Sequence, residues 1–362
     1  MGWDVTAGPD RGEKIRSLVA EPHGRLEDGF GRVHSYVRIA VNEVCNLRCI
    51  YCMPEEGLVF KDREELLTTR EILRVLRVLT GLGVCKVRFT GGEPLLRQDI
   101  RILVEKAVAT EGVESVHLTT NGIFLSDQAG GLRAAGLTGV NISLDTMNAA
   151  RYLEITRRTG LERVLEGIHL AVDLGFSSVK VNTVVLRGFN EDELGDFVDL
   201  TRAVPITVRF IELMPFDSHQ VWKRGHFFSA DWIVESLKKA FPEIRNDTGT
   251  RTERHIYRIP GHAGKVAVIP AYTRTTCPDC NRIRITADGR IRNCLYCTRE
   301  FDLKKILRSG GADEDVTDLF RTAMRTKLES GWDAQKRMAS RTGEHPGNSV
   351  IGHRDSMTQI GG

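Results

Sequence analysis

Short runs of β-branched and other apolar residues alternate with amphipathic stretches along the first two thirds of the chain. Each run has the length of one buried strand, and the runs lie near Tyr36–Val41, Cys85–Thr90, Ser115–Leu118, Gly139–Ser143, Ser178–Val185 and Thr207–Leu213. After the first run, Thr68 and Glu71 have the spacing of a capping box and open a stretch whose apolar residues recur at helical spacing. Strand, helix and strand at this repeat length predict right-handed βαβ units and a parallel sheet. Six units are too few for a closed eight-stranded barrel, so we expect an α/β fold with an open, partial (βα)6 barrel of the TIM type. Its ligands should gather at the carboxyl ends of the strands.

The pattern changes after Met214. The remaining chain predicts a helix at Ala230–Phe241, a strand pair at His255–Ile259 and Lys265–Ile269, a hairpin of Arg282–Thr286 with Arg290–Asn293, and helices at Phe301–Leu307 and Val316–Leu328. Asp288-Gly289 is a strong turn signal for the hairpin. The polar stretch from Glu329 is expected to form an extended tail. We therefore divide the chain into an N-terminal extension (1–25), the partial barrel (26–215), a C-terminal domain (216–340) and a C-terminal tail (341–362).

Composition and charge exclude several classes of protein. The chain has 362 residues, of which 41% are apolar, and 51 basic residues against 48 acidic ones give a net charge of +3. That balance argues against a protein whose main partner is nucleic acid, which would favour a strongly basic surface. No apolar run approaches the roughly 18–20 residues of a membrane span, and the first thirty residues lack the apolar core of a signal peptide. We expect a cytoplasmic protein without a membrane or nucleic-acid partner.

Seven of the eight cysteines fall into two clusters more than two hundred residues apart. In a cytosolic protein, such close spacing favours metal binding over disulfides. Cys45, Cys49 and Cys52 directly follow the first predicted strand. Three thiolates can hold three irons of a four-iron cluster and leave the fourth iron open. The alternatives are a zinc site completed from elsewhere in the chain, or buried cysteines.

The second cluster contains Cys277, Cys280 and Cys294. Arg282 and Arg284 follow its second cysteine, and residues two apart on a strand share a face. Paired arginines beside a metal site suit an anionic ligand. A structural zinc knuckle or a solvated hairpin face remains the alternative.

Several motifs together carry a specific resemblance. The cysteine motif CNLRCIYC (45–52) is followed by KVRFTGGEPLLR (86–97), LTTNG (118–122), GVNISLD (139–145), VKVN (179–182) and VRFIELMPF (208–216). The chain then has CPDCNRIR (277–284), a third cysteine and a terminal Gly361-Gly362. This set resembles the radical S-adenosylmethionine (SAM) superfamily and, within it, the GTP cyclase family of molybdenum-cofactor biosynthesis. The resemblance extends from Asp28 to the end of the chain.

The resemblance implies a role for each matching position. Cys45, Cys49 and Cys52 would hold a first 4Fe-4S cluster whose open iron binds SAM, and Cys277, Cys280 and Cys294 would hold a second 4Fe-4S cluster whose open iron binds guanine. The positions that match SAM contacts are Tyr51, Gly92, Glu93, Ser143 and Met214. The positions that match GTP contacts are Arg38, Lys86, Arg88, Thr119, Lys180, Arg282 and Arg284. Arg209, Gly361 and Gly362 match positions that act directly at the reacting centre.

The implied activity is that of a lyase which converts GTP and SAM into a cyclic nucleotide. SAM is cleaved to methionine and a 5′-deoxyadenosyl radical, which removes the 3′ hydrogen of the ribose, and the sugar then bonds to carbon 8 of guanine. The implied partners are GTP, an electron donor of the flavodoxin or ferredoxin type, and the downstream cyclic pyranopterin monophosphate synthase. A homodimer is also possible within this resemblance.

A few positions depart from the family pattern. Cys297 follows Cys294 by three residues, and is either a free thiol or a fourth cluster ligand. The tail has one extra residue between Arg354 and Met357, which leaves the role of Arg354 open. Two rival functions also stay open: another radical SAM enzyme with an auxiliary cluster, such as a peptide or sulfatase maturase, and a non-enzymatic zinc or nucleic-acid-binding protein.

Overall fold

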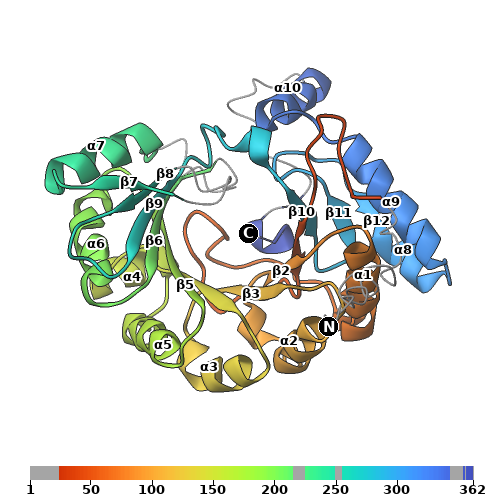
Figure 1. Ribbon diagram of the computed structural model, residues 1–362, viewed down its shortest axis with the longest axis horizontal. Coiled ribbons are helices and arrows are strands. Elements are labelled where there is room, and N and C mark those ends of the chain that lie inside the picture. The colour runs from red at the N-terminus through yellow and green to blue at the C-terminus, as the bar shows by residue number, and fades with distance from the viewer. Residues whose placement is uncertain (1–23, 215–224, 249–254, 343–353, 355, 362) are drawn as a thin grey trace, which may run out of the picture.

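The described strands form one continuous sheet that is strongly curved (Figure 1). The computed structural model describes residues 24–214, 225–248, 255–342, 354 and 356–361, and gives side chains for all of these except 338–342. Within these ranges, twelve strands pair in the order β12-β11-β10-β1-β2-β3-β4-β5-β6-β9-β8-β7. Their bounds are β1 Tyr36–Ala40, β2 Lys86–Thr90, β3 Ser115–Thr120, β4 Gly139–Ser143, β5 Ser178–Val185, β6 Thr207–Glu212, β7 Arg245–Asp247, β8 His255–Arg258, β9 Lys265–Ile269, β10 Arg282–Ile285, β11 Arg290–Arg292 and β12 Phe301–Asp302.

Strands β1 to β6 lie side by side in chain order and pair in parallel, as the βαβ prediction requires. The helices are α1 Thr69–Gly81, α2 Ile100–Val108, α3 Leu125–Ala134, α4 Ala149–Thr156, α5 Leu161–Asp173, α6 Leu194–Ala203, α7 Ala230–Ala240, α8 Leu303–Arg308, α9 Asp313–Arg325 and α10 Gly331–Thr342. Most of them cover the outer face of the curved sheet (Figure 1). The sheet ends at β12 on one side and β7 on the other, so the expected open, partial barrel is confirmed.

Local sequence explains where the elements begin and which face they bury. The amide of Glu71 donates to Thr68 Oγ1 (3.2 Å) and the amide of Thr68 donates to Glu71 Oε2 (2.8 Å), so the predicted capping box starts α1. In β5, every second residue is fully buried, ending with Val185. This alternation places Lys180 and Asn182 on the opposite, inner face of the sheet.

Both edges of the six-stranded core are extended by strands from the C-terminal part of the chain. Strand β9 pairs in parallel with β6, and β10 pairs in parallel with β1. Beyond β9 the sheet continues with β8 and β7, and beyond β10 it continues with β11 and β12. The segment after residue 216 therefore shares one sheet with the barrel, and the proposed domain boundaries remain predictions.

The structure corrects one expectation for the end of the chain. The stretch after Glu329 was expected to be extended, but Gly331–Thr342 forms α10. The amides of Ser330 and Asp333 each bond to the other's side chain, at 3.1 and 3.2 Å, and this capping box starts the helix despite its polar composition. Across the ranges described above, no helix has both the length and the apolar character needed to cross a bilayer.

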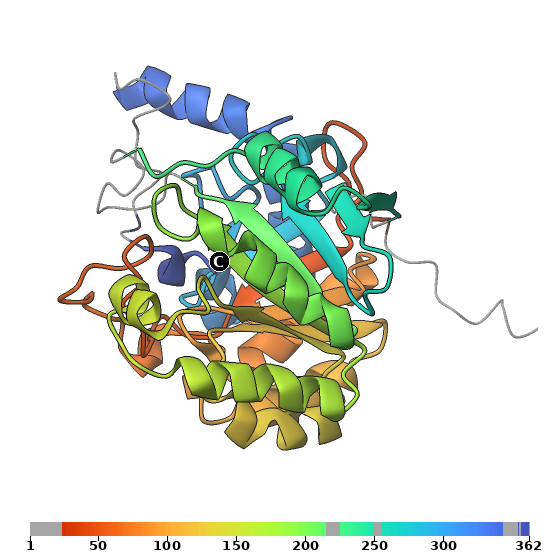
Figure 2. The ribbon, with the colours of Figure 1, turned by 90° about the vertical axis from the view of Figure 1, so that its left-hand side faces the viewer.

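The last described residues return to the inside of the sheet. The short 3-10 helix η6, Met357–Gln359, lies at the centre of the ring of strands (Figure 1). Figure 2 shows it at the same end of the barrel as the loop that follows β1. Residues 354 and 356–361, which we call the C-terminal segment, thus lie at the end of the barrel where ligands of such sheets bind.

Candidate active site

Basic side chains from three adjacent strands face the inside of the barrel together. Arg38 of β1 is paired with Arg284 of β10 on one side and with Arg88 of β2 on the other. Tyr36, two residues earlier on β1, is paired with Arg282 and Lys86 in the same way. Because directly paired residues of a parallel sheet share a face, these cations form two adjacent rows. The expected GTP-contacting residues of these strands are therefore brought together.

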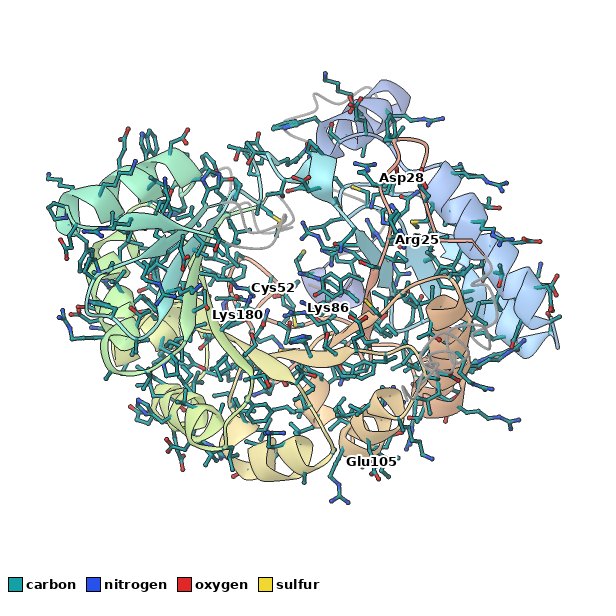
Figure 3. The ribbon with its side chains drawn as sticks, viewed as in Figure 1. Arg25, Asp28, Cys52, Lys86, Glu105 and Lys180 are labelled. Atoms are coloured by element: carbon teal, nitrogen blue, oxygen red, sulfur yellow. The ribbon has the colours of Figure 1, made fainter. Side chains whose placement is uncertain are left out.

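The opposite half of the barrel adds further cations to the same space. Arg209 of β6 donates to Asn182 Oδ1 (2.8 Å), and Asn182 is paired with Ser143. Figure 3 shows Lys86 and Lys180 on the inner side of the sheet, whereas Glu105 lies on an outer helix.

The pKa of His117 on β3 reflects the positive charge that surrounds it. Burial and four neighbouring cations lower its pKa to about 3; the cations are Arg88, Lys86, Lys180 and Arg209. The histidine is therefore neutral at physiological pH. His117 is paired with Arg88 on the neighbouring strand and therefore lies among the cations of the inner face.

Some polar atoms in this space have no partner among the described residues. Arg88 is 5% exposed, and although its Nη1 donates to Thr119 Oγ1 (3.2 Å), its Nε bonds to nothing. The Nε of Arg282 and the Oδ1 of Asn141 are likewise buried without a partner. Buried polar groups without hydrogen bonds are costly. Their presence beside several guanidinium groups favours an anionic, hydrogen-bonding ligand in the barrel.

Tyr36 is a site residue that the sequence analysis missed. Its side chain is buried, its hydroxyl accepts a hydrogen bond from Arg38 Nε (3.2 Å), and the charged groups of Arg38, Lys86 and Arg88 lie 5.4–5.8 Å from its ring centre. Although burial disfavours the phenolate, these cations lower the pKa of Tyr36 to about 7. The sequence could have indicated Tyr36, because it lies two residues before Arg38 on the same predicted strand and therefore shares its face.

The first three-cysteine loop lies at the carboxyl end of β1. The amide of Cys52 donates to the carbonyl of Cys49 (2.9 Å), and the amides of Arg48 and Ile50 donate to the end of α4. Burial raises the pKa of Cys45 to about 12 and that of Cys49 well above its usual range, and the neighbouring cysteines of the loop raise the pKa of Cys49 further. Burial therefore favours the neutral thiols at this loop, and a bound metal would favour the thiolates.

The GGEP motif packs directly against this loop. The amides of Gly92 and Glu93 donate to the carbonyls of Asn42 (3.1 Å) and Val44 (2.7 Å). A Cβ at Gly92 would overlap the backbone of Glu43 and Val44, so only glycine fits. The motif thus fixes the position of the cysteine loop.

Glu93 is fully buried and its carboxylate is engaged within the protein. It accepts hydrogen bonds from the amide of Leu95 (2.9 Å), from Thr120 Oγ1 (2.7 Å) and from the amide of Asn121 (2.7 Å). Burial raises its pKa to about 7. Its direct contact with SAM therefore stays a prediction, while its role in joining β2 to the end of β3 is evident.

The remaining expected SAM contacts lie around the same end of the barrel. The hydroxyl of Tyr51 donates to Asp145 Oδ2 (2.5 Å), and Asp145 also accepts from the amide of Val184 (2.8 Å). Ser143 is the last residue of β4. Met214 follows β6 and packs against a small apolar cluster that includes Ile360 of the C-terminal segment.

The second cysteine group flanks the start of β10. The amide of Gly331 donates to Cys277 Sγ (3.5 Å), and Lys327 Nζ donates to Cys280 Sγ (3.6 Å). Burial opposes ionisation of Cys280, but Lys327 and Arg282 lower its pKa to about 6. Burial raises the pKa of Cys294.

Neither cysteine group has the spacing of a site for one metal ion. In the part of the chain that the structure describes, no three His, Cys, Asp or Glu side chains gather closely enough to hold a single ion. A structural zinc site requires four ligands about 2.0–2.3 Å from one atom. Cys294 and Cys297 both pack against the apolar cluster of Tyr296, Ala334 and Ile360, so the role of Cys297 remains open.

The C-terminal segment reaches the cationic space. Gly361 is buried with a φ of +70°, and its carbonyl accepts a hydrogen bond from Arg284 Nη1. Ser356 Oγ donates to the carbonyl of Cys52 (2.7 Å). Gly362, the other expected catalytic glycine, lies outside the described residues.

Comparison with known proteins identifies two family regions. The model described as "Radical SAM superfamily" matches residues 39–201, and the model described as "Molybdenum Cofactor Synthesis C" matches residues 206–331. The chain is 41% identical over 337 residues to "GTP 3′,8-cyclase" from Chlorobaculum tepidum, which covers 93% of this chain and 97% of that protein. It is 45% identical over 304 residues to "Molybdenum cofactor biosynthesis protein 1" from Bos taurus, covering 83% of this chain and 48% of that protein. The chain thus spans about half the length of this animal relative.

Solved structures share the fold at low sequence identity. A crystal structure of SuiB from Streptococcus suis aligns with a TM-score of 0.56 and 14% identity, covering 83% of this chain and 68% of that chain. A SAM-bound structure of the same protein gives a TM-score of 0.55 with 14% identity, covering 80% and 68% of the two chains. At this identity the likeness concerns the fold alone.

Proposed function

Because the chain belongs to the GTP 3′,8-cyclase family within the radical SAM superfamily, we propose that it converts GTP and SAM into (8S)-3′,8-cyclo-7,8-dihydroguanosine 5′-triphosphate, 5′-deoxyadenosine and methionine. This is the first step of molybdenum-cofactor biosynthesis. Family membership implies one 4Fe-4S cluster and bound SAM. The second 4Fe-4S cluster is part of the proposal.

The observation that carries the proposal is the set of cations that face the inside of the barrel, which we call the cationic chamber. Arg38, Arg88 and Arg284 form one row across three strands, and Lys180 and Arg209 lie across the barrel from them. Guanidinium groups bind phosphate oxygens in a forked geometry, while lysine supplies a mobile point charge. A nucleotide triphosphate matches this excess of positive charge.

We propose that the two cysteine groups each hold an iron–sulfur cluster. Cys45, Cys49 and Cys52 lie in one loop and are each partly buried, and Cys277, Cys280 and Cys294 flank the hairpin that carries Arg282 and Arg284. Three thiolates leave one iron free for a further ligand. When bound, the first cluster supplies the electron that cleaves SAM, and SAM supplies the group that removes a hydrogen atom from the ribose of GTP.

The protein's own contribution is to hold, orient and shield. We propose that Tyr51, Gly92, Glu93, Ser143 and Met214 position SAM at the carboxyl ends of the strands. The cations of the chamber, together with Thr119, would hold the triphosphate and ribose, and Arg282 would direct the base toward the second cluster. Correct placement of the reacting atoms and exclusion of water matter because a carbon radical attacks any hydrogen donor within reach.

The proposed partners follow from this reaction. The first cluster needs an electron donor of the flavodoxin or ferredoxin type, and the product needs a cyclic pyranopterin monophosphate synthase downstream. We also propose a cytoplasmic location, in keeping with eight free cysteines, and a homodimer as the assembly to test.

A direct experiment separates this function from its main rival. The anaerobically reconstituted chain should convert GTP carrying deuterium at the 3′ position, with SAM and a one-electron reductant, into a cyclic nucleotide and deuterated 5′-deoxyadenosine. A peptide or sulfatase maturase would instead place deuterium from a labelled peptide in 5′-deoxyadenosine and leave GTP unchanged. Either unlabelled 5′-deoxyadenosine from labelled GTP or the absence of SAM cleavage would contradict the proposal.

A further inference from the structure

A buried ion-pair network surrounds Arg354, the residue whose role the sequence left open. Its side chain is 8% exposed and donates to both carboxylate oxygens of Glu300, from Nε at 2.9 Å and from Nη2 at 2.7 Å. Nη2 also lies 3.1 Å from Asp288 Oδ1, and Nη1 lies 3.7 Å from Glu43 Oε1. Such a bidentate arginine–carboxylate pair fixes orientation as well as charge.

The three carboxylates come from segments that are distant in the sequence. Glu43 is fully buried and lies between β1 and the first cysteine loop, Asp288 is in the turn between β10 and β11, and Glu300 directly precedes β12. Lys61 pairs with Asp288 and lies 3.7 Å from Glu43, while Arg292 lies 3.3 Å from Glu300. Three acids thus face three cations, and removing Arg354 would leave three acids against two cations, with one negative charge in excess.

Beyond Arg354, the C-terminal segment is held at two more points. Ser356 Oγ donates to the carbonyl of Cys52 at 2.7 Å and accepts from the amide of Thr358 at 3.2 Å, which starts the turn of η6. At its far end, the carbonyl of Gly361 accepts from Arg284. The ion pairs of Arg354 therefore hold the first residue of the segment, and the hydrogen bond from Arg284 holds its last described residue, Gly361.

We propose that Arg354 is a positioning residue whose ion pairs with Glu300, Asp288 and Glu43 anchor the C-terminal segment and thereby present Gly361 to Arg284 inside the barrel. The network joins the loop of the first cysteine group to the hairpin of the second. The segment is thereby held against both halves of the site at once. Its consequence for catalysis rests on the proposed function, but the anchoring itself does not.

Hydrogen exchange of the full-length chain, followed by mass spectrometry, tests the anchor without GTP or SAM. In Arg354→Ala, the amides of residues 357–361 should exchange about ten- to a hundred-fold faster, the range expected for losing charge-assisted hydrogen bonds. Arg354→Lys keeps the charge without the fork and should have an intermediate effect. Arg299→Ala is the matched control, because Arg299 is an exposed arginine next to Glu300 that stacks on Phe301.

The pairing itself is tested by a double substitution. Glu300→Gln should accelerate exchange of the same amides, and adding it to Arg354→Ala should cause little further change, because both remove one interaction. Unchanged exchange in Arg354→Ala would overturn the proposal. So would equal acceleration in α1 and in the C-terminal segment, since that pattern reports general destabilisation.

The two proposals can fail separately. If Arg354→Ala releases the segment, GTP cyclisation should fall in that variant while its iron content stays at the wild-type value. A wild-type chain with a protected segment but no cyclisation would refute the proposed function and leave the anchor intact. An Arg354→Ala variant with a protected segment and full cyclisation would overturn the anchor alone.

Discussion

Arg284 of β10 donates a hydrogen bond to the backbone carbonyl of Gly361, the last described residue of the chain. Arg284 is 5% exposed and lies four residues after Cys280. One guanidinium group therefore links the strand of the second cysteine group to the C-terminal segment. It also lies in the row of cations that we assign to GTP, so substrate binding and tail position share a side chain.

Gly361→Ala should impair cyclisation even though it adds only one methyl group. The residue has a φ of +70°, and a Cβ would lie 3.2 Å from Thr90 Cγ2 and 3.3 Å from Ala40 Cβ. The side chain would therefore strain the backbone and push the carbonyl away from Arg284. Gly310→Ala is a matched control, with a similar φ of +79° but open space around it. Turnover by Gly361→Ala equal to that of the control would contradict the assigned role.

Deleting Gly361 and Gly362 should abolish cyclisation while both clusters and the fold remain. A synthetic peptide that copies the last residues should restore part of the activity, since the segment acts as a separable ligand. Product formation and iron content are measured for the truncated chain with and without the peptide. Full turnover without the peptide would refute a catalytic contribution of the two glycines.

Arg282→Ala should weaken GTP binding about ten- to a hundred-fold, because a charge-assisted contact contributes about 1.5–3 kcal/mol. Arg284→Ala should weaken it similarly, and it should also release the C-terminal segment. Equilibrium binding of GTP, with iron content as a check of the first cluster, measures both effects. Arg290→Ala is the control, since Arg290 of β11 is partly exposed and forms its own ion pair with Asp302 of β12. Wild-type GTP affinity in both arginine variants would mean that neither guanidinium group contacts the substrate.

Replacing Cys45, Cys49 and Cys52 together by Ala should remove one of two four-iron clusters and all SAM cleavage.

In contrast, Cys297→Ser should leave both clusters and the activity intact, because a cluster that binds guanine needs an open iron. Anaerobic iron and sulfide analysis with an assay for 5′-deoxyadenosine checks both variants. Loss of the second cluster in Cys297→Ser would indicate four cysteine ligands, and zinc without iron in the wild-type chain would contradict the cluster assignment altogether.

Tyr36 should make GTP binding depend on pH. Its pKa is lowered to about 7 by Arg38, Arg88 and Lys86, with Arg282 paired beside it, so above pH 7 the phenolate adds a negative charge to an anion site. Affinity for GTP should therefore fall as the pH rises, by about fivefold between pH 7 and 8 if only the neutral phenol binds. Tyr36→Phe should abolish this fall, and the difference between the two proteins removes the contribution of GTP's own titration. Identical pH profiles would exclude ionisation of Tyr36 in the free protein.

The sequence alone determined the elements that depend on local patterns. Apolar runs located the first six strands, and the Thr68–Glu71 pair located the start of α1. The cysteine spacing and the motifs at strand ends identified the family, because such chemistry needs particular residue types at particular separations. These features arise from residues that are close in the chain, so one sequence is sufficient to recognise them.

Tertiary structure alone decided which distant residues meet. Strands β9 and β10 extend opposite edges of one sheet, and only this pairing places Arg282 beside Tyr36 and Arg284 beside Arg38. Arg354 meets Glu43 across more than three hundred residues, an ion pair that no local pattern indicates. The pKa of Tyr36 and the anchoring of the C-terminal segment depend on charges gathered from several strands and loops. Electrostatic energies are set by distance in space and by burial, so they follow from the fold rather than from the order of residues.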